Sequence, residues 1–169
     1  MASDLLIRHA ADGDLDPLVR IYNHYIENTA VTFDTTPFSV TERIAWFTSF
    51  SDEGPHRLLV AESGDEMRGF ASSSPFKRRP AYSTSVETSI YLDPDALGSG
   101  VGTALFGGLI EALKADERLH RAYGGIALPN DASIALHEKF GYELAGTYRE
   151  VGYKFDKFWD VAWYEKDLS

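Results

Sequence analysis

The sequence predicts a mixed α/β domain with one central sheet and helices packed against it. Three observations support this. Apolar residues recur at helical spacing in two long stretches, residues 14–28 and 101–113. Short runs rich in β-branched and aromatic residues lie between and beyond these stretches. The elements therefore interleave in the order β-α-α-β-β-β-α-β-α-β-β, which is neither a regular βαβ repeat nor separate blocks of strands and helices.

The first six elements are predicted over residues 5–7, 14–28, 39–50, 58–61, 68–74 and 85–92. Asp14 or Asp16 can cap the first helix, because a carboxylate there accepts hydrogen bonds from the unpaired amides of the first turn. Ser39 and Glu42 form a capping box, which marks the start of the second helix. A turn at Gly64 joins the next two strands into a hairpin.

The last five elements are predicted over residues 101–117, 123–127, 132–140, 142–149 and 154–166. Gly141 ends the helix before it, because glycine readily adopts the left-handed conformation that follows a helix C-terminus. The final strand is rich in aromatic residues, which suits either the core or contact with a second subunit. No linker or internal repeat interrupts the sequence, so residues 1–169 are expected to form a single domain.

The composition excludes several classes of function. The chain has 169 residues, 44% of them hydrophobic, which is enough to bury a sizeable core. It contains no cysteine, which excludes disulfides, thiolate catalysis and zinc–sulfur sites. The net charge of −10 argues against nucleic acid or an anionic membrane as a partner. The sequence shows no signal peptide and no apolar run near the ~20 residues of a membrane span, so we expect a cytoplasmic protein.

The most informative segment is Leu97-Gly98-Ser99-Gly100-Val101-Gly102, where a strand and a short turn lead into a helix. Glycine has no Cβ and tolerates positive φ, so a ligand can approach the backbone closely. The first amides of a helix lack internal partners and lie at the positive end of its dipole, which favours an anion such as pyrophosphate. The alternative is a turn that only lets the chain bend. The spacing matches neither a P-loop nor a Rossmann loop.

Two side chains are candidates for chemistry. Glu87 lies among small and β-branched residues, where burial would raise the pKa of its carboxyl towards the range of a general base. The alternative for Glu87 is a structural acid paired with a basic side chain. His137 shares a helical face with Ser133, and taken alone this pattern favours a surface histidine. No second histidine lies at metal-ligand spacing from His137, so no metal site is expected.

Lys77, Arg78 and Arg79 form the only basic cluster of this acidic sequence, in a predicted loop. Arginine side chains bind carboxylate or phosphinate groups through two hydrogen bonds, so the cluster indicates a ligand with an acidic group. A solvated loop without a ligand is the alternative.

The glycine loop after an acid-bearing strand resembles the GNAT superfamily of acetyl-CoA-dependent N-acetyltransferases, and so do Asn130 and the helix end at residues 136–142. Three further segments resemble the phosphinothricin and methionine sulfone or sulfoximine N-acetyltransferases: residues 21–33, residues 128–131, and residues 152–155 with 159–161. The resemblance covers almost the whole chain. It implies a GNAT-like, mostly antiparallel central sheet flanked by helices.

The resemblance also implies roles for individual residues. Glu87 would be the general base, acting directly or through water. His137 would be catalytic, at the place where many members carry a tyrosine near the CoA sulfur. Acetyl-CoA would be held by Ile90, Tyr91, Leu92, Leu97, Gly98, Ser99, Gly100, Val101, Gly102, Thr103 and Asn130. The amino-acid substrate would be held by Phe33, Lys77, Arg78, Arg79, Tyr82, Glu87 and Thr88.

One part of the glycine loop departs from the family pattern. Leu97 stands where the family has Gln or Arg, and Gly98 and Ser99 occupy the next two positions, which are often basic. A side-chain contact to the pyrophosphate is therefore missing, while the backbone amides of residues 99–103 can still bind it. We expect binding of acetyl-CoA to be weaker but retained.

The sequence thus predicts transfer of acetyl from acetyl-CoA to the α-amine of a small amino-acid-like substrate of the phosphinothricin, methionine sulfone or methionine sulfoximine type. Direct transfer in a ternary complex is expected. The resembling enzymes form homodimers, so a homodimer is expected too. Two alternatives stay open: an acetyltransferase for another amine (a polyamine, an aminoglycoside or a protein N-terminus), and an acyl-CoA-binding module without catalysis.

Overall fold

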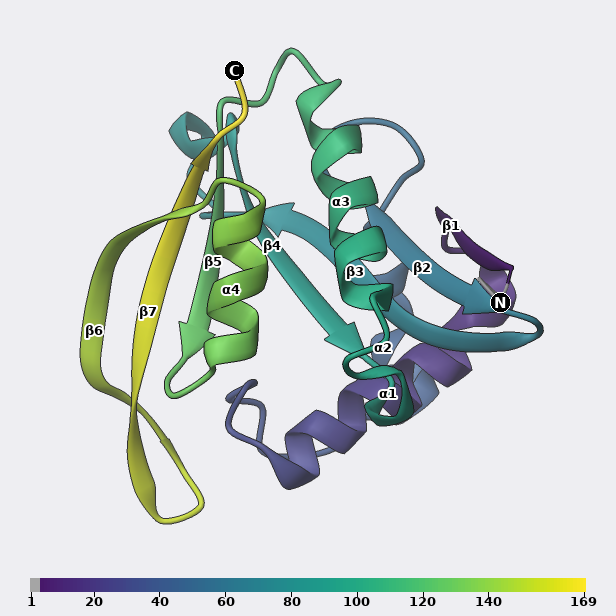
Figure 1. The fold of residues 1–169 in the computed structure, drawn as a ribbon, viewed down its shortest axis with the longest axis horizontal. Helices are drawn as coiled ribbons and strands as arrows, with labels where there is room; N and C mark the ends of the chain where they lie inside the picture. The colour runs from purple at the N-terminus through teal and green to yellow at the C-terminus, as the bar shows by residue number, and fades with distance from the viewer. Residues whose placement is uncertain (1–3) are drawn as a thin grey trace.

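Seven strands form one sheet in the order β1-β2-β3-β4-β5-β7-β6 in the computed structural model of the protein, which describes residues 4–169 (Figure 1). The strands are β1 (Leu5–His9), β2 (Leu58–Ser63), β3 (Glu66–Pro75), β4 (Ser85–Leu92), β5 (Arg121–Ala127), β6 (Glu143–Lys154) and β7 (Lys157–Asp167). The helices are α1 (Leu15–Asn28), α2 (Val40–Phe47), α3 (Val101–Lys114) and α4 (Asp131–Lys139), with short 3₁₀ helices at Asp12–Asp14, Pro80–Tyr82 and Pro94–Ala96. The predicted order is confirmed, and so is the mostly antiparallel sheet, in which β4 and β5 form the parallel pair.

Apolar side chains build a separate core on each face of this sheet. On one face, α3 contributes the fully buried side chains of Leu105, Phe106 and Leu109. On the other face, α1 contributes Leu18 and Ile21, which are buried as well. Figure 1 shows α3 and α4 in front of the strands. Because successive side chains of a strand point to opposite faces, neighbouring residues of β4 reach different cores.

The sheet opens between its two parallel strands. The pairing of β4 with β5 runs from Ser85 opposite Arg121 to Glu87 opposite Tyr123 and ends there. Beyond this pair the two strands diverge (Figure 1), while β4 stays paired with β3 as far as Leu92. The later residues of β4 therefore turn backbone groups towards β5 without the pairing that residues 85–87 make.

Local sequence explains where α2 begins, whereas the start of α1 differs from the local prediction. Ser39 and Glu42 make the predicted capping box, with the Ser39 amide 2.7 Å from the Glu42 carboxylate and the Glu42 amide 3.3 Å from the Ser39 hydroxyl. Asp14 is the N-cap residue of α1 but does not cap it through its side chain, and Asp16 lies within the first turn, so neither acid makes the predicted cap. The carboxylate of Asp14 instead accepts hydrogen bonds from Arg8 at 2.6 Å and from the amide of Ala11 at 2.7 Å.

Helix ends differ from the prediction by a few residues. α2 ends at Phe47 and not at residue 50. The hydroxyl of Ser49 donates a hydrogen bond to the carbonyl of Trp46 at 2.6 Å, and such local side-chain bonds compete with continued helix. α3 ends at Lys114 and not at residue 117. Gly141 follows α4 with a φ of +80°, as predicted. Among residues 4–169, no helix has the length and apolar character needed to cross a membrane.

Candidate active site

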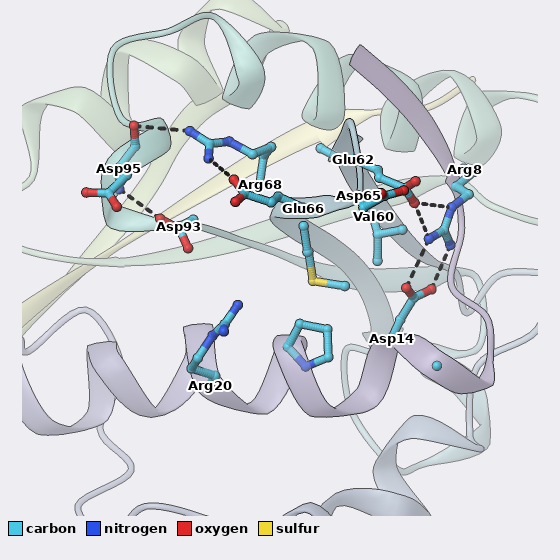
Figure 2. Close-up of a pocket in the computed structure, with 14 residues that line it drawn as sticks. Arg8, Asp14, Arg20, Val60, Glu62, Asp65, Glu66, Arg68, Asp93 and Asp95 are labelled. Carbon is cyan, nitrogen blue, oxygen red and sulfur yellow. Dashed lines mark hydrogen bonds and ion pairs between the residues drawn. The ribbon is translucent and has the colours of Figure 1, made fainter. Parts of the chain in front are cut away.

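Two cavities of similar volume are candidates for the site. The first, of about 650 Å³, lies between α1 and the β2–β3 hairpin and is lined mainly by charged side chains (Figure 2). Many of these charges neutralise each other: Arg8 lies 2.6 Å from Asp14 and 2.5 Å from Glu62, and Arg68 lies 3.4 Å from Glu66. None of the predicted site residues lines this cavity. We therefore take the second cavity as the candidate site.

The second cavity, of about 580 Å³, lies where β4 and β5 diverge. Its walls are the last part of β4, the glycine loop, the end of β5 and one face of α4. It brings together most of the residues predicted to hold the cofactor: Ile90, Tyr91, Leu92, Leu97, Gly98, Gly100, Gly102, Thr103 and Asn130. Thr88 and His137 line it too. Segments far apart in the sequence thus meet at one opening in the sheet.

The glycine loop shapes one end of this second cavity. Gly98 and Gly100 have φ values of +72° and +83°, a left-handed conformation that costs other residues about 1–2 kcal/mol. Gly100 is the N-cap of α3, and no described side chain caps this helix, so its first amides can bind an anion. A Cβ on Gly102 would stand 3.1 Å from the side chain of Leu92. Leu97 is 61% exposed at this end, and its aliphatic side chain has no polar group to offer a ligand.

Glu87 is the last residue of β4 that pairs with β5. Its side chain shares a face of the strand with Ser89 and Tyr91, the face covered by α1, whereas Thr88 points into the other core. Burial raises the pKa of the Glu87 carboxyl, and the nearby Lys77 ammonium opposes that rise. A raised pKa suits a carboxylate that must accept a proton near neutral pH.

The basic loop lies on the same face of the sheet as Glu87. Phe76 stacks on Tyr123 with the ring centroids 4.3 Å apart, and Tyr123 is the β5 neighbour of Glu87. This contact anchors the loop and brings Lys77 close enough to affect the pKa of Glu87. The other predicted substrate residues of the loop are exposed: Arg78, Arg79 and Tyr82.

His137 is buried, with 4% of its surface exposed, so the expectation of a surface histidine is wrong. Its ring packs against that of Phe106, with the centroids 5.0 Å apart. Burial lowers the pKa of His137, so the ring is neutral near pH 7. Its Nδ1–H donates to the carbonyl of Ser133 at 2.7 Å, which leaves the lone pair on Nε2. A Cβ on Gly124 would stand 2.7 Å from Nε2, so glycine at this position of β5 makes room for the ring.

Sequence reasoning missed three residues that shape this site. One is Gly124, and a second is Tyr142, whose buried hydroxyl lies 2.8 Å from the hydroxyl of Thr88. That hydrogen bond holds the hydroxyl of Thr88 in the protein interior. The third is Tyr25, whose hydroxyl donates to the carbonyl of Leu92 at 2.5 Å and ties the end of β4 to α1. Tyr25 and Tyr142 lie in segments that resemble the family, but no local pattern gives any of the three residues a role, because each acts through an element distant in the sequence.

Phe33, predicted to hold the substrate, lies in the loop between α1 and α2 and is 37% exposed. Its ring lies directly over the backbone of Gly152 on β6. Val31, two residues earlier, lines the second cavity together with Tyr25. The α1–α2 loop therefore links the cavity at the β4–β5 opening to the β6–β7 hairpin.

Comparison with known proteins decides the family. Residues 7–163 match the acetyltransferase (GNAT) domain family. The chain belongs to the GNAT acetyltransferases. This GNAT protein is 50% identical to a phosphinothricin N-acetyltransferase of Streptomyces coelicolor, over 98% of each chain. It is 33% identical to an L-methionine sulfoximine/L-methionine sulfone acetyltransferase of Pseudomonas aeruginosa, over 96% of this chain and 94% of that relative.

The solved structures give the same result for this GNAT protein. A GNAT superfamily phosphinothricin acetyltransferase (Pat) of Sinorhizobium meliloti, crystallised in complex with AcCoA, superposes with a TM-score of 0.92. The two are 32% identical, and the match covers 98% of this chain and 89% of that one. The predicted family, fold and enzyme class are thereby confirmed. The roles of individual residues stay predictions.

Proposed function

We propose that this GNAT protein transfers the acetyl group of acetyl-CoA to the α-amine of a small amino acid of the phosphinothricin, methionine sulfone or methionine sulfoximine type. The observation that carries the proposal is the position of Glu87, a half-buried carboxylate of raised pKa at the point where β4 and β5 part, beside the basic loop. Glu87 does not line the second cavity itself, but it directly precedes Thr88, which does. A base next to a cavity at the opening of the sheet supports direct transfer within a ternary complex. The names of two relatives, at 50% and 33% identity, support this acceptor class.

The residues around the second cavity fit acetyl-CoA, which supplies an acetyl group activated as a thioester. The first amides of α3, residues 101–103, would hold the pyrophosphate next to the left-handed glycines. Backbone groups of residues 90–92 would pair with the pantetheine arm like an added strand. The carboxamide oxygen of Asn130 caps α4 by accepting from the amide of Ser133 at 3.2 Å. Its NH₂ group is thus left to donate into the cavity that Asn130 lines.

Glu87 is our assignment for the general base. An amine attacks a carbonyl only in its neutral form, so the substrate ammonium must first lose a proton. The Glu87 carboxylate would accept that proton directly or through one water molecule. Backbone amides at the opening between β4 and β5 would polarise the carbonyl under attack.

His137 is our assignment for a second proton acceptor. It reaches the cavity from α4, on the α3 side of the sheet, whereas Glu87 lies on the α1 side. When the ring of His137 is neutral, its Nδ1–H donates to the carbonyl of Ser133 and its Nε2 carries no proton. We therefore assign His137 to accepting the second proton of the amine, which the nitrogen loses as its bond to the acetyl carbon forms and the C–S bond breaks. The departing thiolate would take up a proton from solvent.

The basic loop is our assignment for the acidic group of the acceptor. Lys77, Arg78 and Arg79 place three positive charges on one loop of a protein whose net charge is −10. A local positive surface is needed here, because the field of the whole protein would otherwise repel an anionic substrate. Arginine forks also match carboxylate and phosphinate geometry.

A thiol-release screen tests the acceptor class. With acetyl-CoA, we expect turnover of phosphinothricin, methionine sulfone and methionine sulfoximine, and kcat/KM at least about tenfold lower for spermidine, an aminoglycoside and a peptide N-terminus. The reason is that the first three combine an α-amine with an acidic group for the basic loop. A preference for spermidine or the aminoglycoside would contradict the assigned acceptor. Binding of acetyl-CoA without thiol release from any amine would indicate a module that has lost catalysis.

We also propose a homodimer built on the β6–β7 hairpin. β6 is an edge strand, and such strands offer unpaired backbone groups to a partner. Exposed apolar side chains gather on the hairpin: Leu144, Tyr148, Val151, Tyr153, Phe155 and Phe158. Sedimentation velocity is expected to give twice the mass of the 18.8 kDa chain, and the Tyr148→Glu variant is expected to shift towards the monomer. A wild-type protein that sediments as a monomer at micromolar concentration would rule the dimer out.

A further inference from the structure

We propose that Lys154 and Gly152 of the β6–β7 hairpin are positioning residues that hold the α1–α2 loop, residues 29–39, against the acceptor side of the site. This inference rests on the proposed function. It adds the β6–β7 hairpin, none of whose residues lines the second cavity. The hairpin would then set the affinity for the acceptor from a distance.

The first contact is made by a buried lysine. Lys154 is 5% exposed, and its Nζ donates to the carbonyl of Thr32 at 2.9 Å. Burial lowers the pKa of Lys154, and the carboxylate of Asp34 opposes that shift. Taking an ammonium group out of water is costly unless the charge finds partners. Both of these partners belong to the α1–α2 loop, so displacement of the loop would leave the ammonium with only the ring of Phe155, whose centroid is 5.2 Å from Nζ.

The second contact is made by an aromatic ring over a glycine. Phe33 lies so close to Gly152 that a Cβ at that position would stand 2.2 Å from the ring. Gly152 has no positive φ, so the ring and not the backbone conformation requires glycine here. Gly152 and Lys154 are two residues apart on β6 and face the same side. One face of the hairpin therefore holds the loop through an apolar and a polar contact.

The same loop is tied to the strand that carries Glu87. The hydroxyl of Thr32 lies 2.9 Å from that of Tyr22 on α1. The ring of Tyr22 meets Tyr91 edge-on, with the centroids 5.1 Å apart. Tyr91 shares its face of β4 with Glu87. Thr32 is thus held from two sides, its hydroxyl by α1 and its carbonyl by the hairpin.

The residues on either side of Thr32 connect this anchor to the site. Val31 lines the second cavity, and Phe33 lies over the hairpin. A shift of the Thr32 backbone would move both side chains. The glycine loop and the start of α3, which are assigned to the pyrophosphate, belong to the other face of the sheet, and Val31 is one residue among many that line the cavity. Loss of the anchor should therefore weaken binding of the acceptor much more than binding of acetyl-CoA.

The variant Lys154→Met tests this inference. We expect the KM for the acceptor to rise about tenfold, because a charge-assisted hydrogen bond to the loop is lost. The Kd for acetyl-CoA, measured by calorimetry, is expected to change much less than the acceptor KM. Lys154→Arg keeps a donor in the same place and is expected to recover most of the acceptor affinity.

Lys157→Met is the matched control, because Lys157 lies on the same hairpin, is exposed and has its Nζ 4.5 Å from the ring centre of Trp159. In Lys157→Met, the KM for the acceptor and the Kd for acetyl-CoA should both stay unchanged. Gly152→Ala is a second route to the same result, since it displaces Phe33 and leaves the lysine in place. An unchanged acceptor KM in folded Lys154→Met or Gly152→Ala would overturn the inference, and so would an equal loss of acetyl-CoA affinity. A wild-type protein that acetylates no amine would instead overturn the proposed function.

Discussion

Replacement of Glu87 by glutamine is expected to lower kcat by about 10²–10⁴-fold, the range that a positioned general base contributes. Glutamine keeps the size and the place of the side chain but cannot accept the proton of the substrate ammonium. The KM for acetyl-CoA should change little, because the residues assigned to hold it lie along the β4–β5 opening and at the start of α3. Steady-state kinetics with each substrate varied in turn measure both effects.

The pH profile is a second readout of Glu87→Gln. Burial raises the pKa of Glu87, and the deprotonated form is the active one. The wild-type kcat/KM should therefore decline as the pH falls through that raised pKa. In Glu87→Gln this acid limb should be missing, and only the deprotonation of the acceptor amine should remain in the profile.

Glu111→Gln is the matched control for Glu87→Gln, because Glu111 is an exposed acid on α3. It is expected to keep the wild-type rate and pH profile. If Glu87→Gln retained wild-type rates at every pH, the base would have to be another group. Loss of the acid limb in His137→Asn, with Glu87→Gln unaffected, would transfer the role to His137.

Gly102→Val is expected to raise the Kd for acetyl-CoA at least about tenfold, which corresponds to ~1.4 kcal/mol. Gly102 lies in the first turn of α3 and lines the cavity, and a Cβ there would already meet Leu92 at 3.1 Å. The branched side chain would cover the amides that are assigned to the pyrophosphate. Calorimetry with acetyl-CoA measures the change, and kcat at saturating cofactor should remain near the wild-type value.

Ala104→Val places the same side chain on the same helix, at an exposed position that does not line this cavity. It should bind acetyl-CoA as the wild-type protein does. Valine is no worse a helix former than glycine, so the helix itself should tolerate Gly102→Val. An unchanged Kd in a folded Gly102→Val variant would mean that the phosphates bind elsewhere.

The features predicted correctly are those that neighbouring residues specify. Ser39 and Glu42 cap α2 because both groups of the capping box lie within one turn. Gly98 and Gly100 adopt left-handed backbone conformations that few other residues tolerate, so a glycine pattern before an apolar helix is informative. The odd and even residues of β4 separate onto two faces because alternation is a property of any strand.

The features missed are those set by partners from other elements. Asp14 fails to cap α1 because its carboxylate is taken by Arg8 of β1. His137 is buried, although its helix looks polar, because α4 packs against β5 and finds a glycine opposite the ring. Lys154 is not among the predicted site residues, because a lysine near a chain turn is usually exposed.

The sequence alone determines three features: the succession of strands and helices, the glycine loop, and the identity of the half-buried acid on β4. Each of them depends on contacts within a few positions of the chain. The opening between β4 and β5, the two faces on which Glu87 and His137 lie, and the contact of Lys154 with Thr32 emerge only when the chain is folded. These features join segments as distant in the sequence as the α1–α2 loop and β6. Their energies depend on burial and on partners supplied by the whole sheet, which no local pattern encodes.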